Sequence, residues 1–209
     1  MMYDVALTTF VALFVIIDPL GNVPIFMALT KGTDLAHQRL MAIKGTITAF
    51  LVLSAFAWFG ADFLHLLGIG LPAFRIAGGL MLGIIAFEMV FEKRNPRKTK
   101  AAEKVHDIAS PDDISVFPLA IPLMAGPGSI ASVMLLMSQH AGDRAAQIMV
   151  NGVLGVVILI SMFAFLMVGP ISKLMTESAT SVVSRLLGII LAALSVQFVI
   201  DGIKNSFGI

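Results

Sequence analysis

The chain has 209 residues, of which 58% are hydrophobic and 13% are charged, and its mean hydropathy is +0.96. About a quarter of the residues of a soluble domain are charged, so this composition excludes an ordinary soluble domain and indicates an integral membrane protein. The net charge of +1 gives no indication of nucleic-acid binding, and the absence of cysteine excludes a disulfide framework or a thiol site.

Long uncharged runs carry most of the hydrophobic excess. Asp, Glu, Lys and Arg are absent from residues 45–61, 114–142 and 145–172. About 20 helical residues cross the roughly 30 Å hydrocarbon core, and a helix satisfies its own backbone groups in lipid. The N-terminal "MMYD" lacks the basic region of a signal peptide, so we expect the first apolar segment to stay in the mature protein.

In chain order, the apolar segments predict an all-α integral membrane protein with six transmembrane helices, near residues 5–29, 40–64, 70–91, 114–138, 145–168 and 183–204. The hydrophilic stretch 92–113 is interpreted as a basic loop. It separates two predicted units of three helices each, residues 1–91 and 114–209.

The first span contains an interruption, "FVIIDPLGNVPIF", at residues 14–26. Asp18 is the only charged residue between Asp4 and Lys31. Asp is a good N-cap, and proline suits the first position of a helix. Asp18 and Pro19 are therefore predicted to begin a second half-helix inside this span. A helix cap and a substrate ligand are both consistent with Asp18 at this depth.

The fourth span contains a similar interruption, "GPGS", which begins at Gly126. Pro127 lies 108 residues after Pro19, and Arg185 lies 110 residues after Arg75. These nearly equal offsets predict two halves of three spans each. Because three is odd, the second half enters the membrane inverted. Inverted repeats with discontinuous helices near the midplane are typical of secondary transporters.

The distribution of Lys and Arg predicts the orientation. If the spans alternate, 11 of the 14 basic residues lie on the side of the 92–113 loop, and three, Arg75, Arg144 and Lys204, lie on the other side. Short loops rich in Lys and Arg stay in the cytoplasm. We therefore expect a multi-pass protein of the inner membrane, with the central loop inside and both termini outside.

Two segments resemble motifs of a known family. "DPLGNVPIF" in the first span and "SPDDISVFPLAIPLMAGPGSI" leading into the fourth are similar to those of the MarC family, which comprises six-span membrane proteins of bacteria and archaea. The resemblance covers essentially the whole chain, including the basic central loop. It implies a transporter of small neutral amino acids such as glycine and alanine, coupled to the proton gradient.

The chemistry of the two breaks suits a small zwitterion. A free helix N-terminus attracts a carboxylate, which we assign to the N–H groups of Gly128, Ser129 and Ile130. The ammonium group is assigned to Asp18 and to the carbonyls that end the first half-helix. The expected substrate-binding residues are Ile16, Ile17, Asp18, Gly21, Asn22, Gly126, Gly128, Ser129 and Ile130.

Other classes of protein fit less well. An aquaporin-like channel also has inverted half-helices, but "NPA" is absent and an acid in the pore wall would be unusual. An enzyme is not expected, because the four histidines lie in loops or at span ends, "HExxH" is absent and Ser129 lacks an evident base. No metal or cofactor is expected either. An efflux pump for larger compounds remains an alternative, because a sequence does not define the volume of a cavity.

Overall fold

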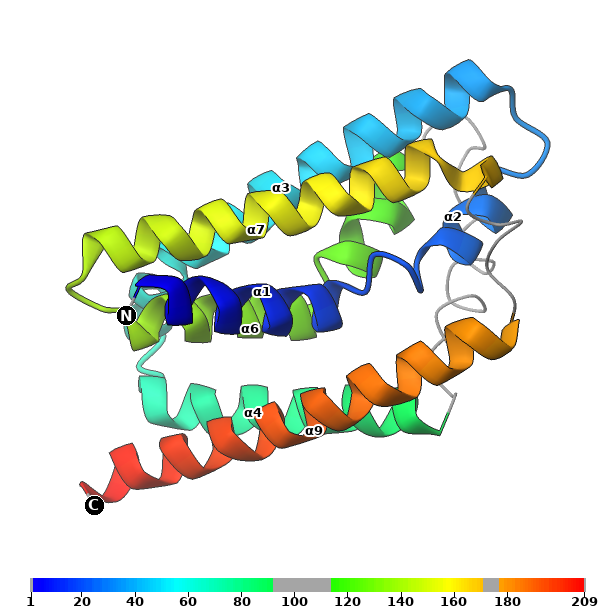
Figure 1. The fold of residues 1–209 in the computed structure, drawn as a ribbon. Coiled ribbons are helices and arrows are strands. Elements are labelled where there is room, and N and C mark those ends of the chain that lie inside the picture. Colours follow the sequence, from blue (N-terminus) through cyan, green and yellow to red (C-terminus); the bar gives the residue numbers. More distant parts are fainter. Residues whose placement is uncertain (1, 92–113, 171–176, 209) are drawn as a thin grey trace.

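The computed structural model describes residues 2–91, 114–170 and 177–208. Its main elements in chain order are α1 (Met2–Ile17), α2 (Val23–Leu29), α3 (Leu35–Leu66), α4 (Leu71–Val90), the π-helix η1 (Ser115–Met124), α6 (Pro127–Gln139), α7 (Arg144–Leu166) and α9 (Glu177–Phe207) (Figure 1).

Four helices are long and apolar enough to cross a membrane by themselves: α3, α4, α7 and residues 181–207 of α9. A fifth candidate span consists of η1 and α6, which meet at an angle of 60° across a short break. α1 is apolar, but its 16 residues are fewer than the roughly 20 that a full crossing needs. The described chain is therefore an all-helical, multi-span membrane protein.

Aspartates in the connecting turns fix where two of the long helices begin. The Asp34 carboxylate accepts the His37 N–H at 2.7 Å at the start of α3. The Asp143 carboxylate accepts the Ala146 N–H at 3.1 Å at the start of α7. Each bond satisfies an N–H group that has no acceptor within its own helix.

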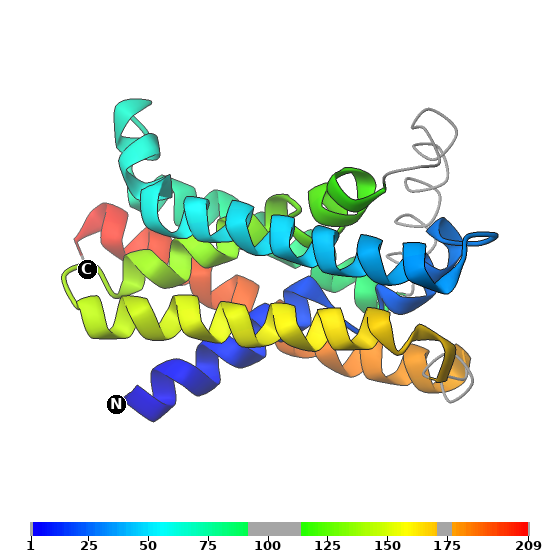
Figure 2. The ribbon, with the colours of Figure 1, turned by 90° about the horizontal axis from the view of Figure 1, so that it is seen from above.

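The helices are arranged in pairs. α4 and α9 lie side by side along one flank, α3 and α7 form a pair on the opposite flank, and α1 and α6 lie between the two pairs (Figure 1). The ends of the chain and the α3–α4 and α6–α7 connections lie at one end of the molecule (Figures 1 and 2). The α2–α3 turn lies at the other end (Figures 1 and 2).

A buried aromatic contact holds the short helix α2 in place. Phe26 of α2 stacks on Phe165 of α7 with ring centroids 4.8 Å apart, and both side chains are fully buried. Such a pair contributes roughly 0.5–1.5 kcal/mol beyond the burial of its area. Because α2 has only seven residues, this contact helps to position the break that precedes it.

The observed helices agree in position with the predicted spans. Residues 40–64 lie within α3, and residues 70–91 extend one residue beyond each end of α4. The predicted interruptions are also present, since the first segment is divided into α1 and α2 and the fourth into η1 and α6. The 92–113 loop, and with it the boundary between the two predicted units, lies outside the described residues.

Candidate functional site

The break in the first segment begins at Asp18, which ends α1. Its N–H donates to the Phe14 carbonyl at 2.9 Å, and its φ is +56°. This is the geometry in which a helix closes on one left-handed residue, a conformation that Asp and Asn adopt more readily than other residues with side chains. A proline also disfavours the helical conformation for the residue that precedes it. Asp18 therefore terminates a helix at the point where Pro19 would disrupt it.

The turn after Asp18 is held by two buried polar side chains. The Asp18 carboxylate accepts the Gly21 N–H at 3.0 Å, and the Asn22 amide donates to the Ile17 carbonyl at 2.7 Å. Asp18 is 4% exposed and Asn22 is fully buried. A Cβ at Gly21 would collide with the Asp18 carboxylate, so any other residue there would displace this side chain. These contacts satisfy backbone groups that a helix break would otherwise leave unpaired inside the membrane.

The prediction that Asp18 and Pro19 begin the second half-helix is wrong. α2 begins at Val23, four residues after Pro19, with Asn22 at the N-cap position and Pro24 in its first turn. Asp18 thus ends one helix and does not begin the next. The assignment of a free carbonyl to Ile17 also needs correction, because that carbonyl already accepts a hydrogen bond from Asn22.

The break in the fourth segment follows the prediction more closely. α6 starts at Pro127, with Gly126 at the N-cap in an extended conformation. η1 before it contains two prolines, Pro118 and Pro122, and the residue preceding each has non-helical backbone angles. Proline displaces the preceding residue from the helical region in this way. The break itself occupies residues 125–126, because Gly128 and Ser129 belong to the first turn of α6.

The start of α6 offers fewer free N–H groups than predicted. Pro127 has no N–H, and the Ile130 N–H donates to the Gly126 carbonyl at 3.0 Å. The assignment of Ile130 to a substrate carboxylate is therefore wrong. Gly128 and Ser129 stand in the first turn, where a helix supplies no internal acceptor. They are the two N–H groups that this terminus presents.

The surroundings of Gly128 bring the two breaks together. A Cβ at Gly128 would meet Ile85 Cδ1, and it would lie 3.7 Å from Leu82 Cδ2 and 4.0 Å from Ile16 Cγ2. Ile16 is the penultimate residue of α1 and lies two residues before Asp18. The first turn of α6, here called the head of α6, therefore lies against the end of α1, as expected for a site that both breaks share.

Two residues that contact this site were missed by the sequence analysis. Ile85 and Leu82 come from α4 and lie against Gly128. Their spacing of three residues places them on one face of a helix, but apolar residues at that spacing are common along this chain. Nothing in the sequence marks these two residues as neighbours of a break more than 40 positions away.

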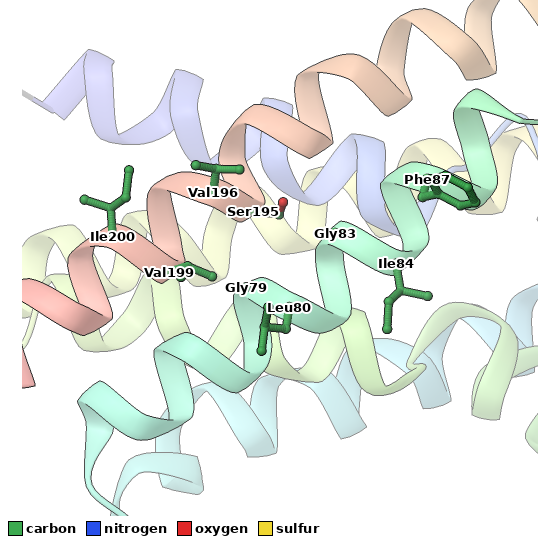
Figure 3. Close-up of a pocket in the computed structure, with 9 residues that line it drawn as sticks. All are labelled: Gly79, Leu80, Gly83, Ile84, Phe87, Ser195, Val196, Val199 and Ile200. Atoms are coloured by element: carbon green, nitrogen blue, oxygen red, sulfur yellow. The ribbon is translucent and has the colours of Figure 1, made fainter.

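A separate groove lies between α4 and α9 (Figure 3). It has a volume of about 460 Å³, and it is lined by Gly79, Leu80, Gly83, Ile84, Phe87, Ser195, Val196, Val199 and Ile200. The Leu80, Ile84 and Val196 side chains are more than half exposed, so the groove opens on the outer flank of two candidate spans. None of the predicted site residues lines it.

The described residues contain no cluster of three or more His, Cys, Asp or Glu side chains that would suit a metal ion. The polar groups of the candidate site are one carboxylate, one amide, the Ser129 hydroxyl and the backbone at two helix ends. These groups are suited to hydrogen bonding and charge recognition of a small polar molecule.

Four apolar helices are long enough to span a membrane, and two further apolar segments contain breaks with buried polar groups. These features define a multi-span helical membrane protein. Residues 3–207 match the profile described as MarC family integral membrane protein. The chain therefore belongs to the MarC family, as its two sequence motifs suggested.

Curated relatives agree with this assignment over nearly their whole length. The chain is 35% identical to the UPF0056 membrane protein YvbG of Bacillus subtilis, with 99% of this chain and 98% of the relative covered. It is 36% identical to a UPF0056 membrane protein of Archaeoglobus fulgidus, with coverage of 94% and 91%. It is 29% identical to YhcE of Escherichia coli, with coverage of 95% and 91%. No solved structure matches the chain.

Proposed function

We propose that this protein is a secondary transporter of small neutral amino acids of the glycine and alanine type. The observation that carries the proposal is that the first turn of α6 lies against Ile16 at the end of α1, two residues before the buried Asp18. The N–H groups of Gly128 and Ser129 would bind the substrate carboxylate. Asp18 would bind the ammonium group, because a buried carboxylate has the opposite charge and can accept several hydrogen bonds.

The proposal includes two inverted repeats of three spans each, with α1 and α2 together as the first span. The helix contacts support this arrangement, because each predicted span touches its counterpart: α1 contacts α6, α3 contacts α7, and α4 contacts α9. Contacts between unlike spans are also matched, since α1 packs on α7 and α6 packs on α3. A pseudo-twofold axis in the membrane plane would generate these pairs, and it would place the site between the repeats.

The proposed orientation places both termini outside the inner membrane. The starts of α4 and α7 and the end of α9, which carry Arg75, Arg144 and Lys204, lie at the same end of the molecule as the termini (Figures 1 and 2). The α2–α3 turn, which carries Lys31, lies at the opposite end (Figures 1 and 2). If the spans alternate, 11 of the 14 basic residues belong to the side of Lys31, which favours a cytoplasmic location for that end.

Transport in proteoliposomes tests the function. Purified protein is reconstituted, and counterflow of labelled alanine and glycine is measured against a panel of other amino acids, with and without an imposed pH gradient. We expect exchange of small neutral amino acids that an inward proton gradient stimulates. Gly128→Val, which adds bulk at the head of α6, is expected to abolish exchange. Folded parent protein that exchanges no amino acid would refute the proposal.

A further inference from the structure

Two kinds of contact hold α4 in the molecule, and they differ in stiffness. Towards α9, the glycines face backbone: a Cβ at Gly79 would lie 2.8 Å from the Ser195 carbonyl oxygen, and one at Gly202 would lie 2.9 Å from the Pro72 carbonyl oxygen. Gly188 similarly faces the Val90 backbone nitrogen at 3.1 Å. Side-chain atoms also lie close to these three glycines, but the backbone atoms cannot move away without their helices, so the contacts favour α4 and α9 staying together as one pair.

Towards α6, the contacts of α4 are made by the ends of flexible side chains. Gly128 faces Ile85 Cδ1, and a Cβ at Gly78 would lie 3.0 Å from Leu135 Cδ1. Ile85 is partly exposed and can move such an atom by a change of rotamer, whereas Leu135 is fully buried and a backbone atom moves only with its helix. The interface between α4 and α6, here called the seam, is therefore the part of this packing that can open while α4 and α9 stay in contact.

The interface between α4 and α6 includes the first turn of α6, where Gly128 lies. Of the side chains around Gly128, Leu82 is fully buried and Ile16 is 2% exposed, whereas Ile85 is only partly buried. Ile85 is thus the neighbour of Gly128 that is partly exposed, and its Cδ1 is the atom nearest to the position of a Cβ on Gly128.

We propose that α4 and α9 move as one body against α6, and that Ile85 is the gate residue whose side chain opens and closes access to Gly128 and Ser129. The inference rests on the proposed transport function for the identity of the substrate. In that setting Ile85 also limits the size of the substrate side chain, because it occupies the space beside the carboxylate-binding N–H groups.

The absence of cysteine permits a test of the gate that does not depend on transport. Ser129→Cys replaces a buried hydroxyl by a thiol of similar size, and its rate of alkylation by N-ethylmaleimide reports access to the head of α6. We expect Ile85→Ala to raise this rate several-fold. Ile84→Ala is the matched control, because Ile84 has the same side chain, lies next on the same helix, and is 58% exposed towards the groove on the outer flank. It should leave the rate unchanged.

A second measurement tests substrate size in the same variants without the added cysteine. We expect Ile85→Ala to raise the uptake of leucine relative to alanine, and Ile84→Ala to leave the ratio unchanged. Ile85→Val, a smaller change, should shift both readouts in the same direction and serves if Ile85→Ala does not fold. Equal alkylation rates for the Ile85 and Ile84 variants would overturn the gate. A faster rate in a protein that transports no amino acid would uphold the gate and refute the proposed function.

Discussion

At the scale of single residues, Asp18 combines a structural and a chemical role. Its left-handed backbone ends α1, and its carboxylate holds the turn through the Gly21 N–H. The same carboxylate is a buried acid in the first of the two helix breaks. Acids inside transmembrane segments are costly, and they commonly mark sites of substrate or ion passage.

Substitutions at Asp18 can separate these two roles. Asn also adopts the left-handed conformation, and its side-chain oxygen can still accept the Gly21 N–H. We therefore expect Asp18→Asn to keep the thermal unfolding midpoint in detergent and to lose most alanine binding and exchange, because the negative charge is gone. Normal exchange by a well-folded Asp18→Asn protein would leave Asp18 with its structural role alone.

Asp18→Leu provides the contrast for this experiment. Leucine cannot accept the Gly21 N–H, so a buried donor is left unpaired at a cost of about 1–3 kcal/mol. Leucine is also disfavoured at positive φ. We expect Asp18→Leu to lower the unfolding midpoint clearly, whereas Asp18→Asn does not. Equal midpoints for the two variants would show that the turn does not depend on this side chain.

At the scale of elements, glycines determine how closely α4 and α9 approach. In the segment "GGLMLG", residues 78–83, Gly79 faces the α9 backbone and Gly83 faces the Ser195 side chain. Small residues permit such approach in membranes, where packing replaces the hydrophobic effect as the force between helices.

Gly79→Ala tests this interface. The added Cβ would lie 2.8 Å from the Ser195 carbonyl oxygen and 3.1 Å from the Val199 nitrogen, both of which are backbone atoms. Overpacking of this kind costs about 1–3 kcal/mol, so we expect a lower thermal unfolding midpoint in detergent. Gly152→Ala is the control within α7, because nothing lies within 4 Å of its added Cβ. The control should be neutral or stabilising by up to about 1 kcal/mol. A Gly79 variant as stable as the Gly152 variant would contradict the close α4–α9 pair.

At the scale of the whole molecule, the orientation depends on which end faces the cytoplasm. The α2–α3 turn and the end of α9 lie at opposite ends of the helices (Figures 1 and 2). The proposed orientation therefore requires that reagents reach these two points from different sides of the membrane.

Labelling of single cysteines tests this orientation. Lys31→Cys in the α2–α3 turn and Ser206→Cys near the end of α9 place exposed thiols in a chain without cysteine. With a membrane-impermeant maleimide, we expect Ser206→Cys to react in intact cells and Lys31→Cys to react only after permeabilisation. The cysteine-free parent gives the background. Reaction of Lys31→Cys alone in intact cells would invert the orientation.

The sequence predicted that two helix breaks exist, but it predicted the residues at which helices end and begin less accurately. Gly126 and Pro127 were identified correctly as the restart of a helix, because a permissive cap followed by proline has few other uses inside an apolar run. At the first break the sequence predicted a start at Asp18–Pro19, whereas α2 begins at Val23. The buried bond from Asn22 to the Ile17 carbonyl, which holds the turn before α2, is made only in the folded chain.

The sequence by itself determined the membrane class, the position of the helices and the existence of two breaks. These follow from hydrophobic runs and from proline and glycine, whose effects act within a few residues. Only the tertiary structure decided that Asp18 ends α1, that the Ile130 N–H is already bonded, and that Ile85 lies against Gly128. Those facts depend on which backbone groups and side chains meet after helices distant in sequence have packed, and no local pattern encodes such contacts.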